Sequence, residues 1–324
     1  MKVLLIVPTF NYASANYPNF LSISDFPTGF AYLAASLKEA GHEVVGLNLN
    51  NKIGYPSARA MIQDLIPKAI AEYRPGLIGL GGICTDYAFL KDAIGIIRQT
   101  APHIPVVLGG GIVNNDAEFI FRLLCPDFCI VGEGEEAIAR LTNYLEHPNI
   151  ATEDGSMGIK GTVLDTFTVE RALGTIDNLG YWNEGKAVFT TINYNYGDIN
   201  SRPFPDYEPF GGKEMVDQYS MATRLLYRYP RLEPRPWGIV TARGCPFNCT
   251  FCVHEKNRQY RPRSIENIMA EIKQTYEQYQ FNILIIVDEL FAVNKERMRE
   301  FCNAILDGKA KYGWDFDWMF QTHA

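Results

Sequence analysis

Short apolar runs alternate with longer amphipathic stretches along the first 145 residues. This alternation, repeated five times, predicts parallel strands joined by helices that cover both faces of one sheet. The predicted strands are Val3–Val7, Glu43–Leu47, Leu77–Leu80, Pro105–Leu108 and Phe128–Val131. The predicted helices are Gly29–Ala40, Ala58–Tyr73, Tyr87–Gln99, Glu118–Leu124 and Glu135–Leu145. The N-terminal part is therefore expected to be an α/β domain with a doubly wound parallel sheet.

The pattern weakens over residues 149–235, where Gly-, Asn- and Asp-rich turns alternate with short β-like pieces such as Ala187–Ile192. Arg202–Phe210 is punctuated by prolines and predicts an extended backbone. We interpret 149–235 as a linker region. A passive tether and a role in closing an active site both remain open.

Strand and helix patterns return from residue 236. The predicted strands are Trp237–Thr241, Asn282–Val287 and Phe316–Gln321, and the predicted helices are Ile265–Tyr279, with Ser264 as its N-cap, and Lys295–Leu306. Three such units begin a (βα) barrel. Residues 236–324 are too few for six units, which need well over ~100 residues. We therefore expect a fragment, or the start of a longer protein.

Glycine-rich loops follow the predicted strands of the first domain. Ligands of doubly wound sheets bind beyond the carboxyl ends of the strands, and glycine lets the backbone approach a large flat ligand. The candidate binding residues in these loops are Thr28, Gly29, Gly82, Thr85, Gly109, Gly110, Gly132, Glu133 and Gly134. A nicotinamide site is disfavoured, because Gly132-x-Gly134-x-x-Ala137 follows the last strand rather than the first.

Composition narrows the class of protein. The chain has 324 residues, 47% of them hydrophobic, and a net charge of −7. This predicts two domains and argues against nucleic-acid or anionic-membrane partners. No apolar run reaches the roughly 18 residues of a membrane span. Seven cysteines without a framework spacing favour a reducing, cytoplasmic location.

Charge changes sign between Arg224 and Arg263, a window with a net charge of +7. Two interpretations stay open: a site for anionic ligands, or a solvated basic face.

Three cysteines, Cys245, Cys249 and Cys252, lie in one short stretch with the spacing C-x3-C-x2-C. Structural zinc takes four closed ligands, and iron–sulfur clusters normally take four thiolates. An iron–sulfur cluster held by three thiolates would have one iron with free coordination positions for a substrate.

At these residues the chain resembles the radical S-adenosylmethionine (SAM) enzymes, whose motif C-x3-C-x-aromatic-C is matched by the three cysteines and Phe251. The resemblance implies that the cysteines hold a 4Fe-4S cluster, whose open iron chelates SAM and whose electron cleaves it to a 5′-deoxyadenosyl radical. It places Phe251 against the adenine. It also implies that Asp288 and Glu289, at the end of a barrel strand, bind the SAM amino group; Asp288 as the cap of the next helix, near Asn294, is the competing interpretation.

The N-terminal half resembles the Rossmann-like, flavodoxin-like cobalamin-binding domain that precedes many radical SAM cores. The matching stretches are Leu4–Pro8, Pro27–Ala34, Leu108–Gly110 and Ile130–Glu135. The resemblance implies a cobalamin-binding domain at 1–148, the linker at 149–235, and the first part of a radical SAM barrel at 236–324.

No Asp-x-His motif occurs, and His42 and His103 are interpreted as solvated turn histidines. Cobalamin is therefore expected without a protein histidine on cobalt.

The resemblance implies a cobalamin-dependent radical SAM enzyme that transfers a methyl group to an unactivated carbon or a phosphorus. Its cofactors would be a 4Fe-4S cluster, SAM and cobalamin, its substrate a small molecule or peptide, and its reductant a flavodoxin or ferredoxin. Radical cyclisation or rearrangement without methyl transfer is the main alternative. A methylthiotransferase-like enzyme and a non-catalytic cobalamin or iron–sulfur module also remain.

Overall fold

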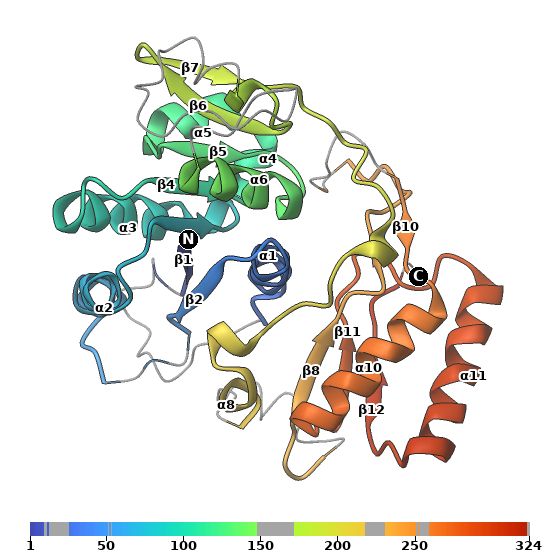
Figure 1. Cartoon of the computed structure of the whole chain (residues 1–324). Helices are drawn as coiled ribbons and strands as arrows, with labels where there is room; N and C mark the ends of the chain where they lie inside the picture. The colour runs from blue at the N-terminus through green and yellow to red at the C-terminus, as the bar shows by residue number, and fades with distance from the viewer. Residues whose placement is uncertain are drawn as a thin grey trace.

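The computed structural model describes residues 1–9, 12, 26–50, 52, 54–147, 172–217, 231–250, 252 and 259–322. They form two α/β units, one around a seven-stranded sheet and one around a three-stranded sheet (Figure 1). Within these ranges, no helix combines the length and the apolar character needed to cross a bilayer.

The larger sheet has the strand order β2-β1-β3-β4-β5-β6-β7. Its first five strands are parallel and are β1 (Lys2–Val7), β2 (Glu43–Asn48), β3 (Leu77–Gly81), β4 (Val106–Gly109) and β5 (Phe128–Ile130). The order 2-1-3-4-5 reverses direction between β1 and β3, where doubly wound sheets bind their ligands. The expected doubly wound fold is confirmed.

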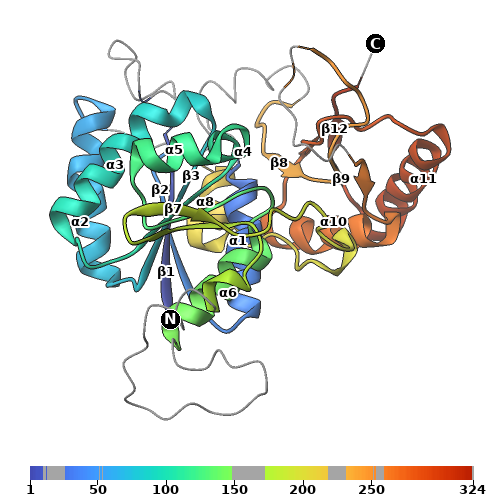
Figure 2. The same ribbon diagram turned by 90° about the horizontal axis from the view of Figure 1, so that it is seen from above.

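Helices cover both faces of this sheet, as Figure 2 shows. They are α1 (Thr28–Glu39), α2 (Ala58–Tyr73), α3 (Tyr87–Thr100), α4 (Gly111–Asn115), α5 (Ala117–Leu124) and α6 (Glu135–Glu146). Alternate side chains of β1 explain the two layers: Val3 and Leu5 pack in the core with α1 and α6, whereas Leu4 and Ile6 pack in the core with α2 and α3.

Two antiparallel strands extend the sheet beyond β5. β6 (Leu179–Asn183) pairs with β5, and β7 (Lys186–Phe189) pairs with β6. The Trp182 ring stacks on Phe121 of α5 at 4.6 Å. The stretch interpreted as a linker therefore contributes to the first domain, and a boundary at residue 148 excludes two of its strands.

The segment after β7 packs between the two units. Phe210 lies against Gly46 of β2, where a Cβ would be 2.6 Å from the phenylalanine ring, and Tyr207 packs against Trp237 at 4.8 Å. The short helix α8 (Gly212–Asp217) follows. The buried Tyr207 and Phe210 of this segment thus pack against both sheets, which a passive tether would not do.

The second sheet has the order β12-β11-β8, with all three strands parallel. Its strands are β8 (Pro236–Ile239), β11 (Ile283–Ile286) and β12 (Asp317–Met319), and α10 (Ile265–Tyr279) and α11 (Lys295–Tyr312) pack beside it (Figure 1). Ser264 caps α10 as predicted, accepting from the Asn267 N–H at 3.1 Å. A two-stranded ribbon, β9 (Ala242–Arg243) with β10 (Arg261–Pro262), leaves this sheet and carries the cysteine loop between its strands.

Candidate functional site: a glycine-rich edge facing a cysteine loop

The loops after β3 and β4 pack backbone against backbone at the carboxyl edge of the large sheet. Gly110 has φ +85°, and a Cβ built on it would lie 2.8 Å from the Gly82 carbonyl oxygen. The Ile112 N–H donates to the same oxygen at 3.0 Å. Only glycine fits this contact, because another residue would suffer both the left-handed backbone and the collision.

The outer side of these loops is open. Ile83 is 59% exposed, and Cys84, Thr85 and Gly110 are exposed beside it. The Asp86 carboxylate accepts the Ile83 N–H at 2.8 Å and fixes the turn. An exposed aliphatic side chain on a rigid glycine backbone is a surface on which a flat ligand can lie, so this edge fits a corrinoid. Gly109 is half-buried, and a Cβ there would make only ordinary contact, 3.7 Å from the Ile130 oxygen.

The loop after β5 is covered by the chain itself. Gly132 has φ +80°, its N–H donates to Asn114 Oδ1 at 2.7 Å, and a Cβ would collide with the Tyr196 hydroxyl. Gly134 is also close-packed, since its Cβ would lie 3.2 Å from Leu33. These two glycines are needed for packing within the protein, which the sequence pattern did not reveal.

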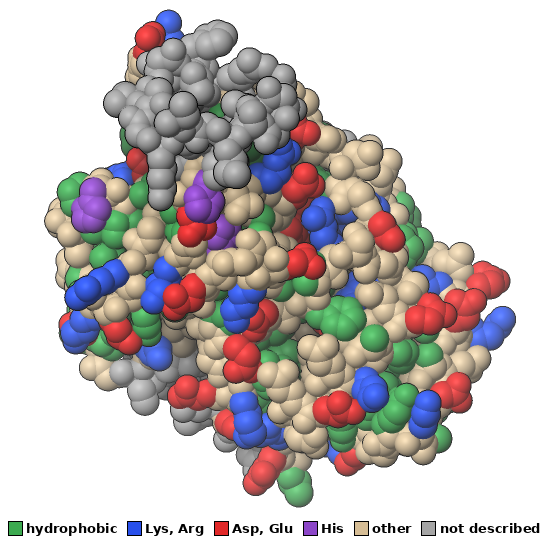
Figure 3. Space-filling model, in the orientation of Figure 1, with side chains coloured by type: hydrophobic (Ala, Val, Ile, Leu, Met, Phe, Trp, Pro, Cys, Tyr) green, Lys and Arg blue, Asp and Glu red, His purple; other side chains and the backbone are tan. Residues whose placement is uncertain are grey.

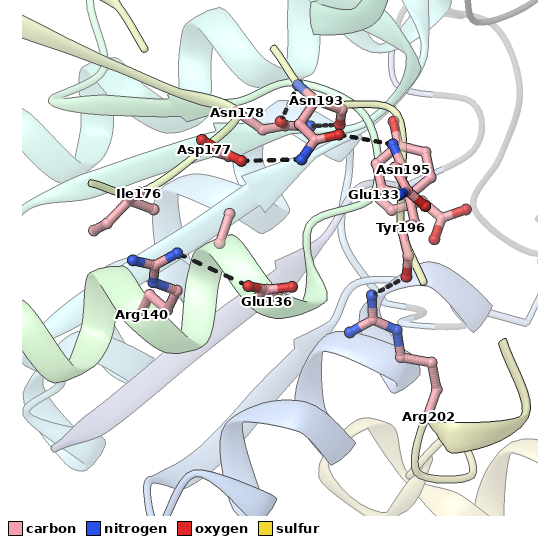
Figure 4. A pocket seen from close by; sticks show the side chains of 11 residues that line it. Glu133, Glu136, Arg140, Ile176, Asp177, Asn178, Asn193, Asn195, Tyr196 and Arg202 are labelled. Atoms are coloured by element: carbon pink, nitrogen blue, oxygen red, sulfur yellow. Dashed lines mark hydrogen bonds and ion pairs between the residues drawn. The ribbon is translucent and has the colours of Figure 1, made fainter. Parts of the chain in front are cut away.

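A polar hollow lies beside this covered loop (Figure 4). Its walls come from the loop before α6 and from α6, from the residues just before β6, and from the segment after β7. The lining residues include Glu133, Arg140, Asn178, Tyr196 and Arg202. The Asn178 side-chain amide donates to the Val131 backbone carbonyl oxygen at 2.8 Å. The Arg202 guanidinium donates to the Tyr196 backbone carbonyl oxygen at 2.8 Å. The sequence pattern gives no sign of Asn178, Tyr196 or Arg202 at this place, because they lie far along the chain from β5, whose end they cover.

Thr28 and Gly29 begin α1. The Tyr207 hydroxyl donates to Thr28 Oγ1 at 3.1 Å, so Thr28 ties the first domain to the segment between the units. Gly29 is exposed and has nothing within 4 Å of a built Cβ. A close-packing role for Gly29 is therefore not supported.

The cysteine loop starts and ends at the β9–β10 ribbon. Gly244 has φ +78°, and a Cβ there would collide with the Gln259 carbonyl group, which closes the base of the loop. Cys245 and Cys249 are half-buried and Cys252 is exposed, and the Cys252 N–H donates to the Cys249 oxygen at 3.1 Å. Phe251 lies outside the described residues.

Within the described residues, no three Cys, His, Asp or Glu side chains are gathered as a metal site. The structure places the three cysteines on one loop as free thiols. The donor set itself fits an iron–sulfur cluster, because three free thiols on one loop supply three soft ligands.

Two arginines of the ribbon bind two carboxylates at the carboxyl edge of the large sheet. Arg243 Nη1 lies 2.8 Å from Glu133 Oε2, Arg243 Nη2 lies 2.5 Å from Glu135 Oε1, and Arg261 pairs with Glu133. Burial raises the pKa of Glu135, but the Arg243 guanidinium outweighs burial and holds that pKa below its usual value. Glu133, which we expected to contact a cofactor, instead uses its carboxylate to bind two guanidinium groups.

The other described arginines of the basic window are also paired with acids. Arg231 binds Asp315 and Asp317, Arg235 binds Asp217, and Arg263 lies 2.5 Å from the buried Glu271. Charges of both signs are interspersed on the face shown in Figure 3. Among the described residues, the basic window is therefore neither an open anion site nor a solvated basic face.

Asp288 and Glu289 follow β11 and have different environments. Asp288 is buried and accepts the Thr241 N–H at 2.6 Å and the Thr241 hydroxyl. Burial raises the pKa of Asp288 to about 6 against the opposing effect of these hydrogen bonds. The cap of α11 is Asn294, so the capping interpretation of Asp288 is wrong. Glu289 is exposed at the strand end.

His42 and His103 lie in turns that lead into β2 and β4, at the edge opposite the glycine loops. His103 is exposed, as expected. His42 is buried, with Nδ1 3.2 Å from Glu146 Oε2, so its interpretation as a solvated histidine is wrong. Burial and the nearby N-terminal ammonium group lower its pKa.

Comparison with known proteins shows which proteins the first domain and the whole chain are similar to. Residues 26–142 match the B12-binding domain family. The chain is 25% identical to an uncharacterized methyltransferase of Pyrococcus horikoshii, with 92% of this chain and 55% of the relative covered. It is 24% identical to the anaerobic magnesium-protoporphyrin IX monomethyl ester cyclase of Cereibacter sphaeroides, with 97% and 45% covered.

A solved structure has a similar fold. The radical SAM methyltransferase TsrM of Kitasatospora setae, solved with cobalamin and a [4Fe-4S] cluster, matches with a TM-score of 0.62 and 17% identity, over 95% of this chain and 51% of that protein. The chain spans about half the length of these relatives.

The chain thus combines a doubly wound domain that matches the B12-binding domain family with a three-stranded parallel sheet and a three-cysteine loop. The resemblance to radical SAM enzymes that carry a B12-binding domain is thereby confirmed.

Proposed function

We propose that this chain belongs to a cobalamin-dependent radical SAM enzyme that transfers a methyl group to an unactivated carbon or a phosphorus. One observation carries the proposal: the stem of the three-cysteine loop is ion-paired to the loop that follows β5 in a B12-binding domain. Two cofactor sites held against one another are what such a reaction needs, because the reacting groups must meet.

The chain's own residues have distinct roles in this proposal. Cys245, Cys249 and Cys252 would hold the cluster. Glu289, exposed at the end of β11, would offer its carboxylate to the SAM amino group, while Asp288 holds the end of β8 through Thr241. The exposed edge with Ile83, Thr85 and Gly110 would face the corrin ring. When bound, the three groups supply one-electron cleavage of SAM and a methyl carrier.

The alignment over 97% of the chain with a cyclase of magnesium-protoporphyrin monomethyl ester supports a second candidate, radical cyclisation without net methyl transfer. The substrate, a small molecule or peptide, and a flavodoxin or ferredoxin as reductant are part of either proposal.

The test is to reconstitute the protein anaerobically with iron, sulfide and hydroxocobalamin, and then to add dithionite and SAM. We expect four irons, one cobalamin and release of 5′-deoxyadenosine. S-adenosylhomocysteine formed together with 5′-deoxyadenosine supports methyl transfer, and 5′-deoxyadenosine alone supports cyclisation. A protein that retains neither iron nor cobalamin would contradict both candidates.

A further inference from the structure

The stem of the cysteine loop places two like charges opposite one another. In the β9–β10 ribbon, Arg243 pairs directly with Arg261 in the antiparallel register. Like charges directly opposite on paired strands destabilise the pair. A two-residue ribbon has few hydrogen bonds to offset that repulsion, so it needs a counter-charge from outside.

Glu133 supplies that counter-charge. Its Oε2 lies 2.8 Å from Arg243 Nη1 and its Oε1 pairs with Arg261, so one carboxylate bridges both strands of the stem. The Glu133 side chain is only 13% exposed. Removing one partner from a mostly buried set of charges leaves the others uncompensated, which is strongly destabilising.

Two tyrosine rings also contact the two arginines of the stem. The Arg243 guanidinium lies over the Tyr32 ring of α1 at 4.6 Å, and the Arg261 guanidinium lies over the Tyr196 ring at 5.0 Å. Cys245 follows Arg243 after a single glycine. The direction in which the cysteine loop leaves the ribbon is therefore set by contacts with the B12-binding domain.

We propose that Glu133 is a positioning residue: by bridging Arg243 and Arg261 it fixes the cysteine loop relative to the glycine-rich edge, and so sets the distance between the cluster and the cobalt. This inference rests on the proposed function for the two cofactors. The bridge itself is a property of the protein alone, and it can be measured without either cofactor.

The first experiment compares Glu133→Gln with Glu136→Gln by hydrogen exchange on the cofactor-free protein. Glu136 is three residues along the chain, is exposed, and has only a 3.8 Å contact with Arg140, so it controls for the change of charge. We expect the amides of Arg243 and Arg261 to exchange at least about tenfold faster in the Glu133 variant and within about twofold of wild type in the control. Equal exchange in the two variants would overturn the proposal.

A second variant covers poor folding of Glu133→Gln. Glu133→Asp keeps the negative charge but shortens the side chain by one methylene, so one carboxylate no longer reaches both arginines, and a smaller increase in exchange is expected. If protection in Glu133→Asp is unchanged, the bridge has no positioning role and the proposal fails.

The second experiment measures the dipolar coupling between cobalt(II) and the reduced cluster by electron paramagnetic resonance. We expect one narrow distance distribution in wild type and in Glu136→Gln, a broad one in Glu133→Gln, and partial recovery in the charge swap Glu133→Arg with Arg261→Glu. An unchanged distribution in Glu133→Gln overturns the inference. A wild type that binds neither cofactor refutes the proposed function instead, and the exchange comparison still decides whether Glu133 holds the stem.

Discussion

The glycine-rich edge and the cysteine loop meet at one junction but are built by different means. The edge is held by backbone contacts between the loops that follow β3 and β4. The cysteine loop is held at its stem by ion pairs to Glu133 in the loop that follows β5. The difference lies in what holds each part: close backbone packing shapes the edge, whereas charged side chains from distant segments hold the stem of the loop.

The largest effect should come from the loop. Replacing Cys245, Cys249 or Cys252 singly with alanine should abolish the iron bound after anaerobic reconstitution, because three ligands leave no spare thiolate. Cys302→Ala, on α11, is the matched control and should keep its iron. Full iron content in all three single variants would contradict the cluster assignment.

The edge should be sensitive to a single methyl group. Gly110→Ala should weaken hydroxocobalamin binding by at least about tenfold, because a left-handed alanine costs about 1–3 kcal/mol and its Cβ would meet the Gly82 backbone at 2.8 Å. The readout is a binding titration by absorbance on the whole chain, since a piece ending at residue 150 would lack β6 and β7.

Gly95→Ala is the control for that substitution. Gly95 lies in α3 and has nothing within 4 Å of a built Cβ, so alanine should leave binding unchanged. If Gly110→Ala and Gly95→Ala bind hydroxocobalamin equally tightly, the close contact between Gly110 and Gly82 does not shape the cobalamin site.

Most of the fold was predictable because the first five strands follow one another locally, each with its own apolar run. The bounds of α2 and α10 agree with the prediction, since Ser57 and Ser264 cap them. The place of β6 and β7 in the sheet was missed, because antiparallel pairing of β6 with β5 across almost fifty residues leaves no local pattern.

From the sequence, the site was predictable only as two separate sets of residues, the glycine-rich loops and the three cysteines. A glycine pattern does not say whether the close neighbour is a ligand or another loop, and Gly110, Gly132 and Gly134 pack against the protein. Glu133 was assigned to a cofactor for the same reason. Its partner Arg261 is 128 residues away, and sequence spacing carries no information on such a pair.

A smaller effect is expected on the pH dependence of stability, where the two acids that follow β11, Asp288 and Glu289, should differ. Because burial raises the pKa of Asp288 to about 6, the folded protein binds more protons than the unfolded chain between about pH 4 and pH 6. The free energy of unfolding should therefore fall as pH rises through that window. Asp288→Asn should remove about 2–3 kcal/mol of this fall. Its amide oxygen can still accept the Thr241 N–H, and the Thr241 hydroxyl can accept from the amide NH2.

Urea unfolding at several pH values measures this slope. Glu289→Gln is the matched control, because it makes the same change from carboxylate to amide at an exposed position next to Asp288. Equal slopes in wild type and Asp288→Asn would mean that the Asp288 carboxyl is ionised normally. The difference between the two acids would then disappear.

The smallest effect is expected from the hydrogen bond between Tyr207 and Thr28. It tests whether Thr28 only joins the first domain to the segment between the units, or also contacts cobalamin. Tyr207→Phe removes the hydroxyl that donates to Thr28 Oγ1 at 3.1 Å while keeping the ring against Trp237. Losing one such hydrogen bond should lower the free energy of unfolding by about 0.5–1.5 kcal/mol. Tyr55→Phe makes the same chemical change at a hydroxyl bound to Asp64, away from the junction. If Thr28 serves only the junction, cobalamin affinity should be equal in the two variants. A selective change of affinity in Tyr207→Phe would instead return Thr28 to the set of cofactor contacts, and the edge would then depend on the segment that joins the two units.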